Sequence, residues 1–201
     1  MNLKKTTNLK DYILIGVLSS INILIMMIVG IITAVLGPAC NALFHSAVGG
    51  LMSGTIILIL AKKTNVKWLF TIVYTITLLV FKLIGMGYLP WQLATIISAI
   101  FADIISMKKK YKDIKLLAIS HGLTITGQAV GKVIPILLFA NKFKRDFLAK
   151  GVEQSYIEGL ISFLKGPMSI TVILMSFTFG VLGIYLGKNI LKKHFEKAGI
   201  V

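Results

Sequence analysis

Charged residues are scarce in this 201-residue chain, and acidic residues are the scarcest. Only 14% of the residues are charged and seven are Asp or Glu, whereas 56% are hydrophobic. Such a composition leaves too little polar surface to cover a soluble globule. From Tyr12 to Ala61 there is no Lys, Arg, Asp or Glu. An uncharged run of this length exceeds any helix of a soluble core, so the sequence predicts an integral membrane protein.

Other absences exclude classes of chemistry. The single cysteine, Cys40, rules out an internal disulfide and a cysteine-based metal cluster. The sequence has no Walker motif or other Gly-rich phosphate loop, no His-x-x-x-His pair and no paired carboxylates within an apolar stretch. We therefore expect neither an enzyme nor a resident cofactor or metal ion. Any energy for transport must then come from a partner or a gradient.

Basic residues are plentiful, with 22 Lys and Arg giving a net charge of +15. They form bands between apolar stretches, which argues against a nucleic-acid-binding protein. The positive-inside rule assigns the main bands to the cytoplasm, and an even number of spans then places both termini there. No cleavage site follows the first apolar stretch, so we expect that stretch to be retained. Four bands hold fifteen of the 22 residues: Lys4, Lys5 and Lys10; Lys62, Lys63 and Lys67; Lys108, Lys109, Lys110, Lys112 and Lys115; Lys188, Lys192, Lys193 and Lys197.

The predicted fold is an all-α bundle of six transmembrane helices in a single domain, residues 1–201, in the bacterial cell membrane. Gly37-Pro38 and the stretch 85–90 separate neighbouring spans by tight outer turns, because proline fits the first turn of a helix but not its interior. Each span has close to the ~20 residues that cross a bilayer. The predicted spans are 12–34, 38–61, 68–86, 89–107, 116–138 and 167–188.

The segment 141–166 is the one long extramembrane stretch expected on the outside. Ile157, Leu160, Ile161 and Leu164 recur at helical spacing, which predicts an amphipathic helix on the outer rim. Such a helix serves either as a lid over a binding site or as a plain interfacial connector, and the sequence leaves both readings open.

Small residues four positions apart recur within the predicted spans. In lipid, helices approach closely where small residues face each other. We expect most of these pairs to pack within the bundle, although each can also face a partner protein. The pairs are Gly16 with Ser20, Gly50 with Gly54, Gly127 with Gly131, and Gly183 with Gly187.

Five ionisable residues fall within the apolar spans, where such groups are costly and often functional. Lys82 lies near an outer end, where its stem can simply reach the headgroups. Asp103 lies one turn before a lysine cluster, and we expect it to pair with a lysine or cap nearby backbone. His45 and His121 differ in predicted depth by roughly 15 Å at 1.5 Å per residue, so joint ligation of one metal or haem is not expected. Lys132 is the fifth residue.

Polar groups of the predicted outer half converge on a candidate binding site. His45 and Asn41 lie one turn apart in the second span, and Lys132 and Gln128 lie one turn apart in the fifth. Two lysines without a carboxylate at that depth favour an anionic cargo. For His45 the alternative to cargo binding is a structural role, as a packed and hydrogen-bonded histidine. The predicted substrate-binding residues are Lys132, Gln128, Gln92, Trp91, His45, Asn41 and Lys82.

Two stretches resemble a known family: 102–105 (Ala-Asp-Ile-Ile) followed by basic residues and Tyr111-Lys112, and the ending 186–200. Both look like Trep_Strep or MptD-type substrate-binding S components of energy-coupling-factor (ECF) ABC transporters, and the likeness runs nearly end to end. The resemblance implies a subunit that captures a vitamin-like or other scarce nutrient outside. It then delivers the nutrient through a coupling membrane protein and two ATPases.

The resemblance also implies an interface for the coupling protein. In better known S components a small-xxx-small pattern of the first helix makes this contact, and Gly16 and Ser20 match it, with glycine and serine in place of alanines. Some members are linked to haem uptake, in which case His45 is an axial ligand and Lys82 or Lys132 lies near the propionates. A stand-alone secondary transporter is the other alternative, but it predicts repeated halves and a mid-membrane carboxylate that the sequence lacks.

Overall fold

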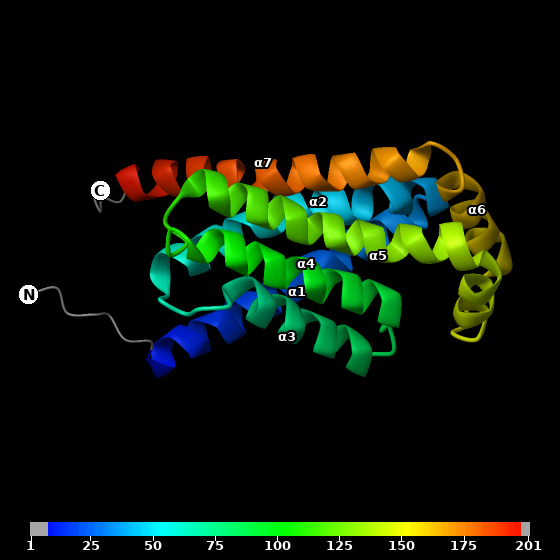
Figure 1. Cartoon of the computed structure of the whole chain (residues 1–201), viewed down its shortest axis with the longest axis horizontal. Helices are drawn as coiled ribbons and strands as arrows, with labels where there is room; N and C mark the ends of the chain where they lie inside the picture. The colour runs from blue at the N-terminus through cyan, green and yellow to red at the C-terminus, as the bar shows by residue number, and fades with distance from the viewer. Residues whose placement is uncertain (1–7, 198–201) are drawn as a thin grey trace, which may run out of the picture.

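The computed structural model describes residues 8–197 and consists of helices throughout, with no β-strand in that range, as predicted. Six of the helices run along one axis, and α6 crosses them at one end (Figure 1). The helices are α1 Leu9–Val35, α2 Pro38–Lys63, α3 Leu69–Leu83, α4 Leu89–Met107, α5 Ile114–Leu148, α6 Gln154–Leu164 and α7 Met168–Lys197.

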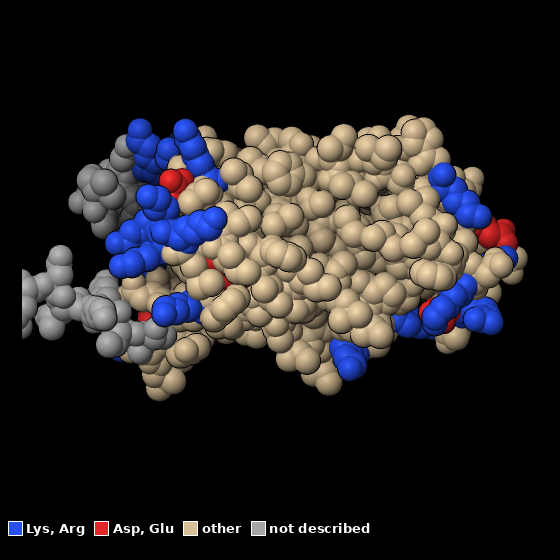
Figure 2. Space-filling model, viewed as in Figure 1, with Lys and Arg blue, Asp and Glu red and all other residues tan. Residues whose placement is uncertain are grey.

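Within residues 8–197, five helices are long and apolar enough to cross a membrane: α1, α2, α4, α5 and α7. The helix α3 is also apolar but has 15 residues. At 1.5 Å per residue it reaches about 22 Å, short of the ~30 Å hydrocarbon core. Five of the six predicted spans therefore correspond to helices of sufficient length, and the span predicted at 68–86 corresponds to a helix that is too short to be counted with them. On the face in Figure 2, Lys and Arg gather toward the two ends of the molecule and the middle is largely free of them.

The two ends of the bundle differ in chemistry. At one end α1 begins, α2 and α4 end, and α7 ends (Figure 1). We call it the basic end because it carries the lysine bands of residues 62–67, 108–115 and 188–193. The opposite end, covered by α6 and the last part of α5, we call the capped end. Assignment of the basic end to the cytoplasm remains a prediction of the positive-inside rule.

Five helices form a ring in the order α1, α2, α5, α4, α3, in which each packs on its neighbours and α3 closes on α1. The helix α7 lies outside this ring, against α2 and α5. Across the ring the described helices approach each other much less than ring neighbours do; α2 and α3, for example, make only a small contact. Side chains, rather than close backbone contacts, therefore fill the centre of the ring.

Three of the four small-residue pairs pack within the bundle. A Cβ on Gly54 would collide with the backbone of Gly183, and a Cβ on Gly183 would lie 2.6 Å from the Gly50 carbonyl oxygen. A Cβ on Gly127 would lie 2.8 Å from the Ala94 carbonyl oxygen. The expectation that most pairs pack internally is thus confirmed.

The pair Gly16 and Ser20 is the exception. Nothing lies within 4 Å of a Cβ placed on Gly16, and Ser20 is exposed. The Ser20 hydroxyl donates to the Gly16 carbonyl oxygen of its own helix at 3.0 Å. This stretch of α1 therefore presents small residues outward and uses neither of them for packing inside the chain.

Asp103 caps a helix, as expected, but the helix is not its own. The N-cap of α3, Trp68, has a left-handed backbone and supplies no side-chain cap. Instead Asp103 of α4 accepts hydrogen bonds from the backbone N–H groups of Phe70 at 3.0 Å and Thr71 at 2.8 Å, and from the Thr71 hydroxyl at 2.7 Å. Donors left unpaired at a helix start are satisfied in this way.

The tight turn predicted between the first two spans is present. Gly37 has φ +105°, a conformation that other residues rarely adopt, and Pro38 begins α2.

The predicted end of the fifth span is less sharp. Phe139 has non-helical angles (φ −138°, ψ 42°), yet the helix resumes and runs to Leu148. Residues 141–148 were predicted to lie outside this helix, but their charges are compatible with a helix that has left the apolar layer.

Candidate solute-binding site

The structure brings three of the predicted site residues together near the capped end, two of them in direct contact. Asn41 and His45 lie one turn apart on α2, and Lys132 lies on α5. The Lys132 ammonium donates to the Asn41 side-chain oxygen at 3.4 Å. The Asn41 amide nitrogen in turn donates to the Thr33 hydroxyl at 3.1 Å and the Gly30 carbonyl at 3.4 Å. These five residues form what we call the capped-end cluster.

His45 is packed against α1 within this cluster. A Cβ on Gly30 would lie 3.3 Å from its Nε2 atom, so the ring lies directly on the backbone of Gly30. The ring also interacts with the Met26 backbone and with the charge of Lys132. Because Nε2 faces α1, a haem iron can reach this nitrogen only if α1 and α2 separate. The arrangement agrees better with a packed histidine than with an open axial ligand.

Gln128 and Trp91 flank the cluster. Gln128 is buried one turn below Lys132 on α5, so both side chains lie on one helix face. The first turn of α4 lies against α5, since a Cβ on Gly131 would be 2.6 Å from the Trp91 Cα. The Trp91 ring packs edge-on against Phe81, with 5.5 Å between centroids. The Trp91 ring thus packs in the apolar cluster of Ile23, Met26 and Phe81.

Gln92 and Lys82 are placed differently from the others. The Gln92 amide donates to the Leu78 carbonyl at 3.2 Å, which ties α4 to α3. Lys82 lies in the last turn of α3 and is exposed. Within residues 8–197, no hydrogen bond or ion pair connects Lys82 to the capped-end cluster.

The cluster is suited to bind a small anion. Its one full charge is the half-buried ammonium of Lys132, which has no carboxylate within ion-pair distance among the described residues. The amide of Asn41 donates to Thr33 and Gly30, and the Thr33 hydroxyl donates to the Val29 carbonyl at 2.7 Å, so these groups hold the site together and Lys132 is the group that attracts an anion. Within residues 8–197 there is no group of three His, Cys, Asp or Glu side chains that would hold a metal ion.

A cap of helices covers this end of the bundle. The predicted amphipathic helix is present as α6, and it buries Ile157, Leu160 and Leu164. These side chains pack in one apolar cluster with residues of α2, α5 and α7. A Cβ on Gly159 would lie 2.6 Å from the Cγ of Pro38, so α6 approaches the start of α2 closely. Pro38 is three residues from Asn41, so the cap lies next to the capped-end cluster.

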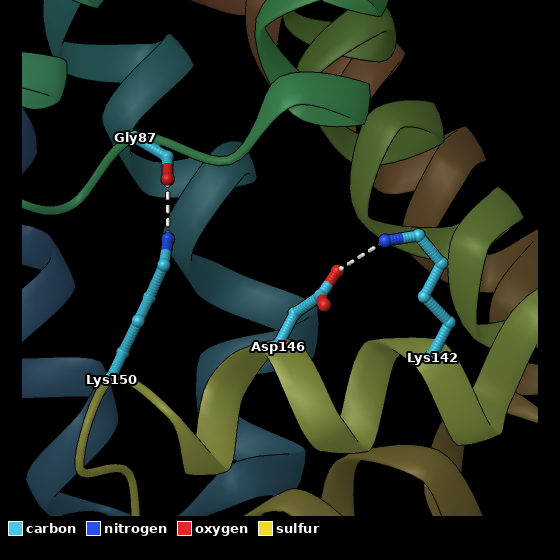
Figure 3. Close-up of polar contacts among 4 residues, drawn as sticks. All are labelled: Gly87, Lys142, Asp146 and Lys150. Atoms are coloured by element: carbon cyan, nitrogen blue, oxygen red, sulfur yellow. Dashed lines mark hydrogen bonds and ion pairs between the residues drawn. The ribbon is translucent and has the colours of Figure 1, made fainter.

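The cap is fastened to the loop that leads into α4. Lys150 donates to the Gly87 carbonyl oxygen, as Figure 3 shows. Its ammonium also lies 5.5 Å from the centroid of Phe147 and 5.9 Å from that of Tyr88, within reach of cation–π attraction. Burial, assisted by the charge of Asp146, raises the pKa of Tyr88 to about 12. We call the contact of Lys150 with this loop the latch.

The match to a known family covers almost all of this structure. A family model described as "hypothetical bacterial integral membrane protein (Trep_Strep)" matches residues 9–197. The chain belongs to this family. It is accordingly a multi-pass bacterial membrane protein, in agreement with its five candidate spans. No curated protein and no solved structure matches the chain.

In this Trep_Strep protein the candidate site includes residues that the sequence analysis missed. Gly30 and Thr33 of α1 contact Asn41, although no binding residue was predicted in the first span. The available signal was Thr33, a hydroxyl near the end of an otherwise apolar run. Thr33 reaches Asn41 only because α1 and α2 pack side by side. The spacing of polar residues along one span does not reveal which helices pack together.

Proposed function

We propose that this protein captures a small anionic nutrient at its capped end and acts as the substrate-binding S component of an ECF-type importer. The observation that carries the proposal is Lys132, an ammonium within the helix bundle whose hydrogen-bond partner is the neutral side chain of Asn41. A lysine at such a position is costly without a counter-charge. An anionic cargo supplies that charge each time it binds.

The division of labour in such an importer fits the composition of this chain. The sequence has no motif for nucleotide binding, so transport driven by ATP requires ATPases on other subunits. Two ATPases and a coupling membrane protein are the partners that we propose. The outward-facing Gly16 and Ser20 are the surface we assign to the coupling protein, because small residues allow another helix to approach closely.

The proposed binding of an anion at the capped end is tested by substituting Lys132. The chain is purified in mild detergent, and the small molecules it retains are quantified by mass spectrometry and visible absorption. Lys132→Met is expected to lower the retained anion at least tenfold, which corresponds to about 1.4 kcal/mol of binding free energy. Lys165→Met, an exposed lysine in the cap, is the matched control and is expected to retain the cargo.

Three results would argue against this assignment. Equal retention by both variants would remove Lys132 from the site. A Soret band in the unmodified protein would point to haem uptake and make His45 the next residue to substitute. Solute accumulation by vesicles that contain this chain alone would favour a secondary transporter, because an S component needs its coupling partners.

A further inference from the structure

A second group of polar side chains lies in the ring between the capped-end cluster and the basic end. Ser19 and Asn22 belong to α1, Tyr74 and Thr77 to α3, Ser53 to α2 and His121 to α5. All six are buried, with at most 2% of each residue exposed. We call them the deep cluster. The role proposed above for the capped-end cluster does not use any of them.

Contacts connect these residues across four helices. The Asn22 amide nitrogen donates to the Thr77 hydroxyl at 3.5 Å. Tyr74 precedes Thr77 by about one turn of α3, and its hydroxyl lies beside Ser53. The Ser53 hydroxyl lies 3.3 Å from the His121 Nε2 atom. The cluster therefore extends from α1 to α5 through the centre of the ring.

Four buried polar atoms of this cluster have no hydrogen-bond partner among residues 8–197: Ser19 Oγ, Asn22 Oδ1, the Tyr74 hydroxyl and His121 Nδ1. The His121 Nε2 atom lies 2.9 Å from the Gly50 carbonyl oxygen, which can only accept, so Nε2 carries the hydrogen. In the neutral ring Nδ1 is then an acceptor. Native structures seldom leave buried polar atoms unpaired, because each one costs about 1–3 kcal/mol.

The unpaired atoms determine what kind of ligand fits. They include two acceptors, Asn22 Oδ1 and His121 Nδ1, and two hydroxyls that both donate and accept. An ion would find no opposite charge among these six residues. Water, which donates two hydrogen bonds and accepts others, matches the whole set, and buried water typically makes about three such bonds. The hydroxyl of an alcohol donates one hydrogen bond and so satisfies one of the two acceptors.

An apolar layer separates this cluster from the capped-end cluster. Met26 and Phe81 lie one turn closer to the capped end than Asn22 and Thr77, and they pack together with Ile23. A Cβ on Gly49, one turn from Ser53 on α2, would meet the sulfur of Met26 at 2.5 Å. The two polar groups are thus distinct sites at different depths.

We propose that Ser19, Asn22, Tyr74 and His121 form a buried binding site for an uncharged oxygen ligand, supplied either by water or by the hydroxyl of a bound alcohol. The site joins α1 to α3 and α5 through the ligand. This inference does not depend on the transport function proposed above, since it concerns different residues at a different depth.

Tyr74→Phe provides the direct test, because the Tyr74 hydroxyl makes no well-formed hydrogen bond within the described residues and only lies beside the Ser53 side chain. If the site is filled, the ligand loses a partner and the midpoint of thermal unfolding in detergent falls, by about 2–4 °C for a loss near 1 kcal/mol. If the site is empty, deletion of an unpaired hydroxyl leaves the midpoint unchanged or raises it, which would overturn the proposal.

The matched control is Ser176→Ala, which removes another fully buried, unpaired hydroxyl from α7, outside the ring. Among the described residues no other buried, unpaired side-chain atom belongs to α7, and a buried water needs several polar partners, so the midpoint of Ser176→Ala is expected to stay unchanged or rise. If Ser176→Ala lowers the midpoint as much as Tyr74→Phe, the loss is that of any core deletion, and the proposal fails.

The source of the oxygen is identified by radiolytic labelling of the unmodified protein in nanodiscs prepared in ¹⁸O water. Bound water produces hydroxyl radicals locally, so Tyr74 is labelled although buried, whereas Phe143, buried in the apolar cap, is not. Without a label on Tyr74, native mass spectrometry is expected to show a bound alcohol that Tyr74→Phe loses. Absence of both label and alcohol would overturn the proposal.

Discussion

The hydroxyl of Tyr111 donates a hydrogen bond of 2.7 Å to the carboxylate of Asp103. Asp103 is fully buried and also accepts from Phe70 and Thr71 at the start of α3. Burial, together with this acceptor, raises the pKa of Tyr111, so its hydroxyl stays protonated and continues to donate. One carboxylate therefore holds together α3, α4 and the loop that precedes α5.

Asp103→Asn is expected to destabilise the protein by about 2 kcal/mol or more. The substitution replaces a carboxylate oxygen, which accepts hydrogen bonds, with an amide NH2 group, which can only donate and would face the N–H and O–H donors around residue 103. Hydrogen bonds to charged groups contribute roughly 1.5–3 kcal/mol each. The measurement is thermal unfolding in detergent. Asp113→Asn is the control, because Asp113 caps α5 at an exposed position and Asn caps helices equally well. Equal losses in the two variants would contradict this role of Asp103.

Gly54→Ala and Gly16→Ala are expected to act in opposite directions. A Cβ on Gly54 collides with the backbone of Gly183, which cannot move aside cheaply, so α2 and α7 must separate. A Cβ on Gly16 meets nothing within 4 Å, and alanine favours a helix over glycine by about 0.8–1 kcal/mol. Unfolding midpoints of the two purified variants are compared. A loss with Gly16→Ala would indicate a contact of α1 that the isolated chain lacks.

Gly16→Leu is expected to abolish association with the coupling protein and leave cargo retention unchanged, because the added side chain projects outward from α1. Co-purification of the coupling protein and the two ATPases is measured alongside the retained cargo. Ile28→Phe adds bulk at another exposed position of α1 and is the control. Full association of the Gly16→Leu variant would remove this part of α1 from the proposed interface.

Lys150→Met is expected to loosen the cap, because the substitution removes the latch to Gly87 and the cation over Tyr88 and Phe147. Amide hydrogen exchange is expected to become faster in α6 and in the loop that contains Gly87. Lys142→Met is the control. Lys142 forms an exposed i,i+4 pair with Asp146 at 3.1 Å, which contributes only about 0.3–0.5 kcal/mol. Unchanged exchange in the Lys150 variant would show that the cap is held by its apolar contacts alone.

The amino-acid sequence was sufficient to predict the membrane class, the helical content and the approximate helix positions. These features follow from local properties: long uncharged runs, proline at helix starts and bands of lysine between spans. The amphipathic spacing of Ile157, Leu160 and Leu164 likewise predicted the helix α6, which buries all three. The helix resuming after Phe139 was missed, because charged residues outside the apolar layer are compatible with either a loop or a helix.

Which polar residues meet was decided only by tertiary structure. The sequence grouped Asn41, His45 and Lys132 by depth, and depth was enough because these residues lie on neighbouring helices. Depth alone also placed Lys82 and Gln92 in the site, whereas one is exposed and the other is bonded to α3. The deep cluster was not predicted at all. Asn22, Tyr74 and His121 come from helices whose facing sides are fixed by helix rotation and ring order, and these depend on packing between distant segments.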